Sequence, residues 1–187
     1  MKKRCYWVTN DPLYIAYHDE EWGVPVYDDE TLFEFLVLET FQAGLSWITI
    51  LKKRENFRQA FDQFDYKKIS QYGDEKFQEL IENAGIIRNK LKIKGTISNA
   101  QAFMRIQEDF GSFSKYIWRF VDGKPIKNAF ENREDVPAKT ELSDKVSKDL
   151  KKKGFKFVGS TVIYAFMQAT GMVNDHSVDC FRYNECS

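Results

Sequence analysis

Apolar side chains recur at intervals of three and four residues along most of this chain, which is the pattern of helices with one buried face. The longest stretches predict helices over about Thr31–Ala43, Arg88–Gln107 and Ser160–Thr170. No segment alternates apolar and polar residues as a half-buried strand does, and the nearest, "FKFVG" at 155–159, is short. We therefore expect an all-α fold.

Shorter amphipathic segments complete the predicted set of helices. Three groups of apolar residues follow helical spacing, namely Phe57, Ala60, Phe61 and Phe64; Phe77, Leu80, Ile81 and Ala84; and Phe113, Ile117 and Phe120. Asp74 and Ser143 are of the types that cap helix N-termini, and Gly85 and Gly154 are of the type that ends helices. Residues 122–142 contain Gly and Pro, so they predict a long loop.

The composition limits the size and the surroundings of the protein. Hydrophobic residues make up 43% and aromatic residues 16% of 187, enough for one core, so we expect a single domain over residues 1–187 or two closely packed helical lobes. Charges balance, so a nucleic-acid-binding surface would need its basic residues gathered on one face. No apolar run approaches the ~18 residues that span a bilayer, and the N-terminus does not resemble a signal peptide. The odd count of three cysteines favours a reducing, cytoplasmic setting.

The few histidines and cysteines form one pair near each end of the chain. His176 stands four positions before Cys180, so both share a face if a helix continues there, and Cys5 and His18 lie near the start. Imidazole and thiolate are zinc ligands, and a structural zinc site takes four of them. Such a site would join the two ends of the chain. The alternative is a surface histidine and core cysteines without a metal.

A catalytic zinc is a further interpretation of the same residues. His18, Asp19 and Glu20 match the H-x-E part of a zinc-deaminase signature. The P-C-x-x-C part of that signature is absent from the chain, so the sequence gives a zinc hydrolase little support.

One acidic residue, Glu39, lies within an apolar helix face made by Leu32, Phe35, Leu36 and Ala43. Burying a carboxylate is costly unless it is hydrogen-bonded or paired. Aromatic residues are nearby in sequence at Trp7, Tyr14, Tyr17, Trp22 and Trp47. Together with the carboxylate they could enclose a flat cationic ligand through stacking and cation–π attraction. Alternatively, Glu39 bonds a backbone amide or an arginine, and the aromatic residues belong to the core.

A short turn joins two of the predicted helices at Ala84–Ile87, and basic residues follow it at Arg88, Lys90, Lys92 and Lys94. Free backbone N–H groups at a helix N-terminus bind phosphate, and such contacts position a protein on nucleic acid without reading its sequence. The basic runs at 52–54 and 151–153 could line the same surface. The alternative is an ordinary helical hairpin with a solvated basic face.

Long collinear stretches of the sequence resemble the Tag-type 3-methyladenine DNA glycosylases. They are "RCYW", "DPLYIAYHDEEWGVP", "QAGLSWITILKKRENF", "AGIIRNKLKI" and "KKKGFKFVGSTVIYAFMQATGMVNDH", and they extend over nearly the whole chain to Cys180. The resemblance implies an all-α helix-hairpin-helix fold. One position departs from the family pattern, because Tyr6 stands where a glycine is usual between Cys5 and Trp7.

The resemblance also implies roles for individual residues. Glu39 and Tyr17 would act on the base directly as the catalytic pair, and Trp47, Trp7 and Tyr14 would bind it. The residues expected to contact DNA are Gly44 and Leu45, which would enter the duplex, and the phosphate-gripping turn of Gly85, Ile86, Ile87 and Arg88. The ligands of one structural Zn²⁺ would be Cys5, His18, His176 and Cys180.

From this resemblance we expect a monomeric DNA-repair enzyme that flips 3-methyladenine out of alkylated double-stranded DNA and releases it as the free base. No lysine is singled out as a Schiff-base former, so we expect no strand cleavage. No aspartate just past the Gly85–Arg88 turn presents itself as a general base. The rival hypothesis is a zinc-stapled helical module that binds DNA without chemistry. No role is predicted for Cys186.

Overall fold

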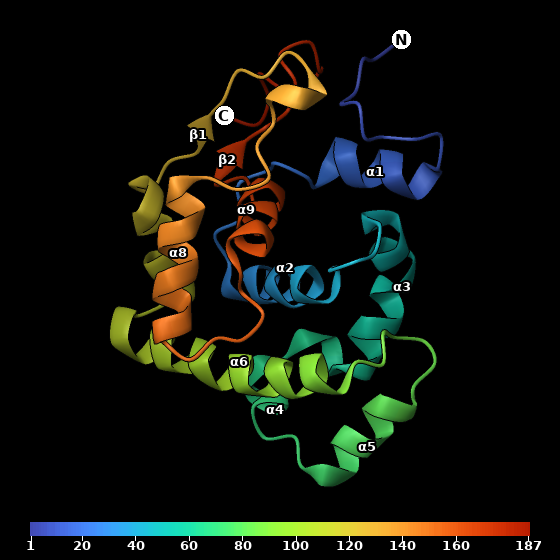
Figure 1. Cartoon of the computed structure of the whole chain (residues 1–187), viewed down its shortest axis with the longest axis vertical. Coiled ribbons are helices and arrows are strands. Elements are labelled where there is room, and N and C mark those ends of the chain that lie inside the picture. The colour runs from blue at the N-terminus through green and yellow to red at the C-terminus, as the bar shows by residue number, and fades with distance from the viewer.

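The computed structural model describes all 187 residues and is built almost entirely from helices (Figure 1). Its helices are α1 (Pro12–Glu20), α2 (Asp29–Phe41), α3 (Trp47–Ala60), α4 (Tyr66–Ile69), α5 (Asp74–Glu82), α6 (Lys90–Phe110), α7 (Phe113–Trp118), α8 (Glu141–Lys152) and α9 (Ser160–Ala169). Three 3₁₀ turns lie at Asp62–Phe64, Arg119–Val121 and Arg133–Asp135. The strands β1 (Ile126–Lys127) and β2 (Val173–Asn174) form one parallel pair. The mostly helical prediction is confirmed.

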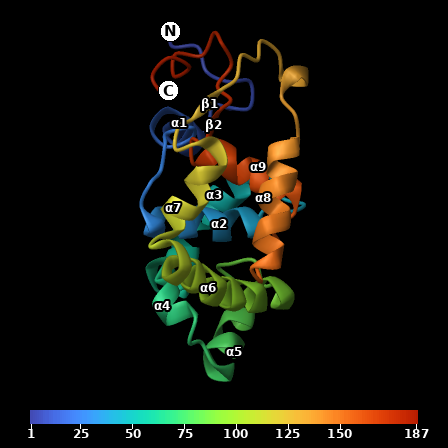
Figure 2. The ribbon, with the colours of Figure 1, turned by 90° about the vertical axis from the view of Figure 1, so that its left-hand side faces the viewer.

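Helix α2 lies at the centre of the molecule, with α6, α4 and α5 toward one end and α1 toward the other (Figures 1 and 2). Every residue from Phe35 to Phe41 is buried, and α2 packs against α3, α6, α7 and α9. A helix that is apolar on all sides is a core helix. The two polar residues in this stretch, Glu39 and Thr40, are therefore both buried in the interior.

Helices α2 and α6 begin at capping side chains, and these positions differ from the ends predicted from apolar spacing. Helix α2 begins and ends earlier than predicted, because Asp28 accepts a bond from the Thr31 amide at 2.9 Å and Ala43 is already exposed. Helix α6 begins later than predicted, because Asn89 caps it by accepting from the Lys92 amide at 3.1 Å. The interior of each helix agrees with the prediction.

Two residues predicted as N-caps lie inside their helices. Ser143 is the third residue of α8 and forms a capping box with Thr140. The Thr140 amide donates to Ser143 Oγ at 2.8 Å, and the Ser143 amide donates to Thr140 Oγ1 at 3.1 Å. Asp74 is the first residue of α5, after Gly73.

The C-terminal segment after α9 is not helical. Gly171 has a φ of +72°, and a Cβ there would lie 2.5 Å from the backbone nitrogen of Pro25, so only glycine fits. The helix does not continue to residues 176–180, so the condition under which His176 and Cys180 would share a helix face is not met. A turn brings them together instead, in which the Cys180 amide donates to the Ser177 carbonyl at 2.8 Å.

One continuous cluster of 39 buried hydrophobic residues runs through the molecule. Both termini lie at the same end, near α1 and the strand pair (Figures 1 and 2). There the Phe181 amide donates to the Lys3 carbonyl at 3.0 Å. None of the helices is both long and apolar enough to cross a bilayer.

Candidate functional site

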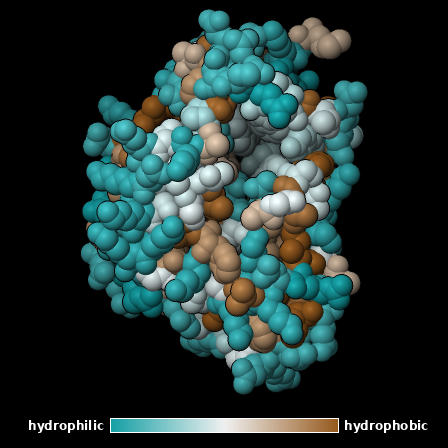
Figure 3. Space-filling model, viewed as in Figure 1, coloured by the Kyte–Doolittle hydropathy of each residue, from teal (hydrophilic) through white to brown (hydrophobic).

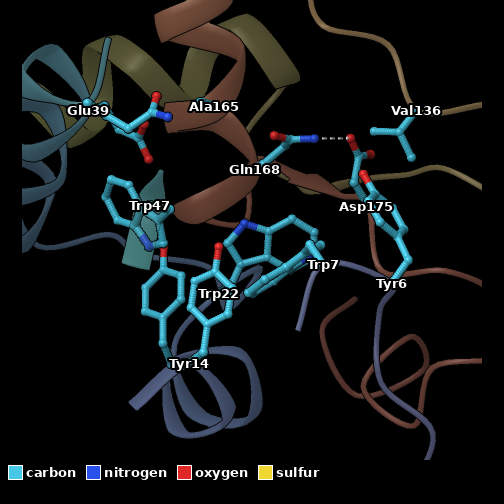
Figure 4. Close-up of a pocket in the computed structure, with 12 residues that line it drawn as sticks. Tyr6, Trp7, Tyr14, Trp22, Glu39, Trp47, Val136, Ala165, Gln168 and Asp175 are labelled. Carbon is cyan, nitrogen blue, oxygen red and sulfur yellow. Dashed lines mark hydrogen bonds between the residues drawn. The ribbon is translucent and has the colours of Figure 1, made fainter. Parts of the chain in front are cut away.

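A cavity of about 200 Å³ opens between α1, α2, α3 and α9, on the face that Figure 3 shows hollowed in its upper half. Half of its lining residues are aromatic (Figure 4). The lining residues are Tyr6, Trp7, Tyr14, Tyr17, Trp22, Glu39, Gln42, Trp47, Val136, Ala165, Gln168 and Asp175.

Glu39 reaches the cavity from the buried helix α2 and is only 4% exposed. No side chain or backbone amide of the protein donates a hydrogen bond to its carboxylate. The one buried arginine, Arg54 of α3, bonds Glu21 and Glu34 instead, each at 2.9 Å. The structure therefore shows neither the arginine pair nor the amide bond that would give Glu39 a purely structural role. It also removes Arg54 from the basic surface expected at 52–54.

Burial raises the pKa of the Glu39 carboxyl to about 8, so without a cation beside it the group is mostly protonated at neutral pH. A cation placed beside it would favour the ionised form, because opposite charge lowers the pKa of a carboxyl. The cavity thus holds a group whose charge responds to the charge of the ligand.

The aromatic rings of the wall pack against one another, edge to face around Trp7 and tilted between Tyr17 and Trp47. The Trp7 ring lies 5.1 Å from both Tyr14 and Trp22, between ring centroids, and Tyr17 lies 5.6 Å from Trp47. The indole N–H groups of Trp7 and Trp47 are buried and have no hydrogen-bond partner. Because a buried donor is normally satisfied, these two N–H groups indicate a site that a polar ligand completes.

Tyr17 is 3% exposed, and burial, with Glu39 nearby, raises the pKa of its phenol well above the usual value. The phenol therefore stays protonated, so it is available as a hydrogen-bond donor at all relevant pH values.

The structure brings together all five residues predicted to act on or bind the base, since Glu39, Tyr17, Trp47, Trp7 and Tyr14 all line this cavity. The half-exposed Tyr6 lines it too, without displacing Trp7 from the wall.

Sequence reasoning missed the other lining residues of the cavity, which are Gln42, Val136, Ala165, Gln168 and Asp175. A weak signal existed, because Gln168 is a polar residue inside an apolar helix and Asp175 directly precedes a predicted metal ligand. Val136 falls in the predicted loop and gave no signal.

Gly44 and Leu45 lie in the loop between α2 and α3, beside the cavity. Gly44 has a φ of +77°, and a Cβ placed on it would meet no atom within 4 Å, so the loop tip is open. Gln42 accepts at its carbonyl from the Leu45 amide at 2.8 Å and donates from Nε2 to the Leu45 carbonyl at 2.7 Å. Since Gln42 itself lines the cavity, these bonds fix Leu45 at its rim.

The turn at 85–88 joins α5 to α6 and packs against α3, where Asn56 Nδ2 donates to the Gly85 carbonyl at 3.1 Å. None of its residues lines the cavity. The Gly85 amide donates to Asn83 Oδ1 at 2.8 Å, and the buried Ile86 donates to the Asn83 carbonyl at 3.4 Å. The turn therefore offers fewer free amides than predicted, those of Ile87 and Arg88.

The two His/Cys pairs meet in one buried cluster beside the cavity. The ligand atoms of Cys5, His18, His176 and Cys180 all lie within 4.8 Å of one another. Cys180 Sγ lies 3.4 Å from His18 Nε2 and 3.5 Å from His176 Nδ1. Around one ion, tetrahedral sulfur and nitrogen ligands are separated by roughly 3.5 Å. The donor set and its geometry therefore fit a metal.

The outward-facing nitrogens of both histidines are held by the protein. His18 Nδ1 lies 2.8 Å from Asp19 Oδ1, and His176 Nε2 lies 2.9 Å from the Trp22 carbonyl. Arg4 binds the Asp19 carboxylate at 2.7 and 2.8 Å and holds its pKa at about 2. Such partners orient histidine ligands toward a metal.

Comparison with known proteins identifies the chain. The family model of methyladenine glycosylases matches residues 7–183. The chain belongs to this family. It is therefore a glycosylase, an enzyme that hydrolyses N-glycosidic bonds, and the resemblance seen in the sequence is confirmed.

Known members are similar over almost their full length. The chain is 50% identical to DNA-3-methyladenine glycosylase 1 of Escherichia coli, covering 97% of each protein. A solved 3-methyladenine DNA glycosylase I superposes with a TM-score of 0.93 at 52% identity, covering 96% of this chain and 98% of the other. The Staphylococcus aureus enzyme, solved to explain its 3-methyladenine recognition, superposes at 0.92 with 38% identity, covering 95% of each.

Proposed function

We propose that this chain excises 3-methyladenine from alkylated double-stranded DNA by hydrolysing the bond between base and sugar. The observation that carries the proposal is the buried Glu39 carboxyl, which has no protein partner and faces an aromatic cavity. The known activity of the relatives points to the same substrate. Because the base inside a duplex is out of reach, the nucleotide must first leave the stack.

The reaction needs little general-acid catalysis from the protein. Adenine methylated at N3 is cationic, so its bond to the sugar is weakened and it leaves as a neutral base. In our proposal Trp47 stacks on the ring while Tyr17 and Glu39 hydrogen-bond its edge. Glu39 ionises beside the cation and gains a charge-assisted bond, which neutral adenine does not offer. No lysine lines the cavity, so we propose a monofunctional enzyme that leaves the DNA strand intact.

The DNA contacts follow from the rim of the cavity. Leu45, fixed by Gln42 beside the open tip at Gly44, would fill the space that the base leaves in the duplex. In a helix-hairpin-helix arrangement, the free amides of Ile87 and Arg88 would contact a phosphate. Gly85 and Ile86 would support that turn rather than touch DNA, since their amides are already bonded.

We propose that the Cys/His cluster holds one structural zinc ion per chain. Two imidazoles and two thiolates are a common zinc set, and four protein ligands leave no open position for a reacting water. That donor set argues against the deaminase hypothesis. The ion would fasten both ends of one domain of two packed lobes, which would act as a monomer.

The direct test is chromatography of the bases released from methylated duplex DNA, with gel analysis of the same strands. We expect free 3-methyladenine and strands that break only when heated in alkali. Binding to the duplex without any released base would instead support the module without chemistry. Strand breaks that appear before alkali treatment would contradict a monofunctional enzyme.

A further inference from the structure

The cavity has a second polar side chain, Gln168 of α9, which lies across from Glu39 (Figure 4). Its Nε2 donates to Asp175 Oδ2 at 2.9 Å. A carboxylate can only accept hydrogen bonds, so the amide nitrogen of Gln168 must face Asp175 and the amide oxygen must face away from it. In Figure 4 that oxygen points across the cavity, toward the side of Glu39.

Asp175 is well placed to hold this orientation, because it is itself fixed and buried. It accepts from Asn128 Nδ2 at 2.7 Å on one oxygen and from the Tyr164 hydroxyl and Gln168 on the other. Three hydrogen-bond donors, one just after β1 and two on α9, point at the Asp175 carboxylate. Asp175 is therefore the acceptor in all three bonds. Gln168 Oε1 itself accepts no hydrogen bond from the protein.

We infer that Gln168 Oε1 is the acceptor for the exocyclic amino group of the flipped base, and that it selects adenine over guanine. Adenine carries an amino donor at this edge, whereas guanine carries a carbonyl acceptor. In a guanine derivative the carbonyl oxygen would lie against Gln168 Oε1, and neither acceptor would have a donor. Leaving two buried acceptors unpaired costs more free energy than the loss of a single contact. This inference rests on the proposed function of the cavity.

Gln168→Leu tests the inference, because leucine keeps the bulk and removes the acceptor. The measurement is the separate release of 3-methyladenine and 3-methylguanine from the same methylated duplex. We expect the adenine-to-guanine rate ratio to fall by roughly tenfold, the effect of one buried hydrogen bond. Gln78→Leu, on the exposed face of α5, makes the same chemical change away from the cavity and should keep the wild-type ratio.

Asp175→Asn provides an independent arm, because an asparagine amide can donate to Gln168 and so allow its amide to turn over. The ratio should fall in the same direction, with thermal melting showing that the variant is folded. An adenine-to-guanine rate ratio that stays unchanged in Gln168→Leu would overturn the inference, whether both release rates are unchanged or both fall equally. If the wild-type protein releases neither base, the proposed function itself fails.

Discussion

The residue to which we assign the central role in base recognition also costs stability. Glu39 is buried without a partner, and its pKa is about 8 in the fold against 4.5 as its ordinary value. Between these two pH values the folded state binds more protons than the unfolded state, so the free energy of unfolding falls as pH rises. Below about pH 4.5 the cost of burying the charge is absent, because the carboxyl is protonated in both states.

This argument gives a prediction for Glu39→Gln, whose side chain does not titrate. Relative to wild type, the variant should gain stability as pH rises, by roughly 3 kcal/mol at pH 7 compared with pH 4.5. Urea unfolding of both proteins at pH 5, 7 and 8 measures the difference. A difference that does not change with pH would show that Glu39 titrates normally in the fold.

At the same scale, the sequence predicted part of the cavity lining and missed the rest. Glu39 was identified because a carboxylate stands out against an apolar helix face, and the aromatic residues because they cluster in sequence around it. Asp175 is held by Tyr164 and by Asn128, which lies in a distant loop, and Asp175 in turn orients Gln168. Hydrogen bonds between distant segments leave no periodic signal in a sequence.

At the scale of elements, apolar spacing predicted most of the helices but not α1 or α4, and it predicted the helix ends less well. The spacing reports which face is buried, whereas the ends depend on single side chains such as Asp28, Asn89 and Thr140. The segment after α9 shows the same limit. His176 and Cys180 were paired by their chemistry, and the structure brings them together through a turn after Gly171 and not through a continued helix.

Element packing also explains why the cavity and the Cys/His cluster are neighbours. Cys5 and Trp7 lie two residues apart, and His176 bonds the carbonyl of Trp22. The Trp7 ring packs edge-on against His18, 5.3 Å between centroids. The aromatic wall of the cavity is thus built on the same segments that form the Cys/His cluster.

At the scale of the whole molecule, the Cys/His cluster joins segments that almost the full length of the chain separates. A cross-link around a loop of about 100 residues stabilises by roughly 4.7 kcal/mol when it constrains the unfolded chain. For a protein of this size that corresponds to roughly 9–19 °C in Tm. We predict that a strong chelator lowers Tm by about this amount.

Two cysteine variants make the test specific. Cys180→Ser should lose the bound metal and show the same lowered Tm without chelator. Cys186→Ser is the matched control, because Cys186 is also buried but lies outside the cluster. It should keep its metal. Metal analysis with thermal melting checks both, and a chelator that leaves Tm unchanged while removing the metal would contradict a structural role.

The most direct test of the central claim, that a buried carboxylate in an aromatic cavity selects a cationic purine, is single-turnover release of 3-methyladenine by Glu39→Gln. Binding to undamaged duplex is measured in parallel. The rate should fall by roughly ten- to a hundredfold, the effect of losing a charged hydrogen bond, with duplex binding unchanged. Release of 3-methyladenine at the wild-type rate would contradict the claim.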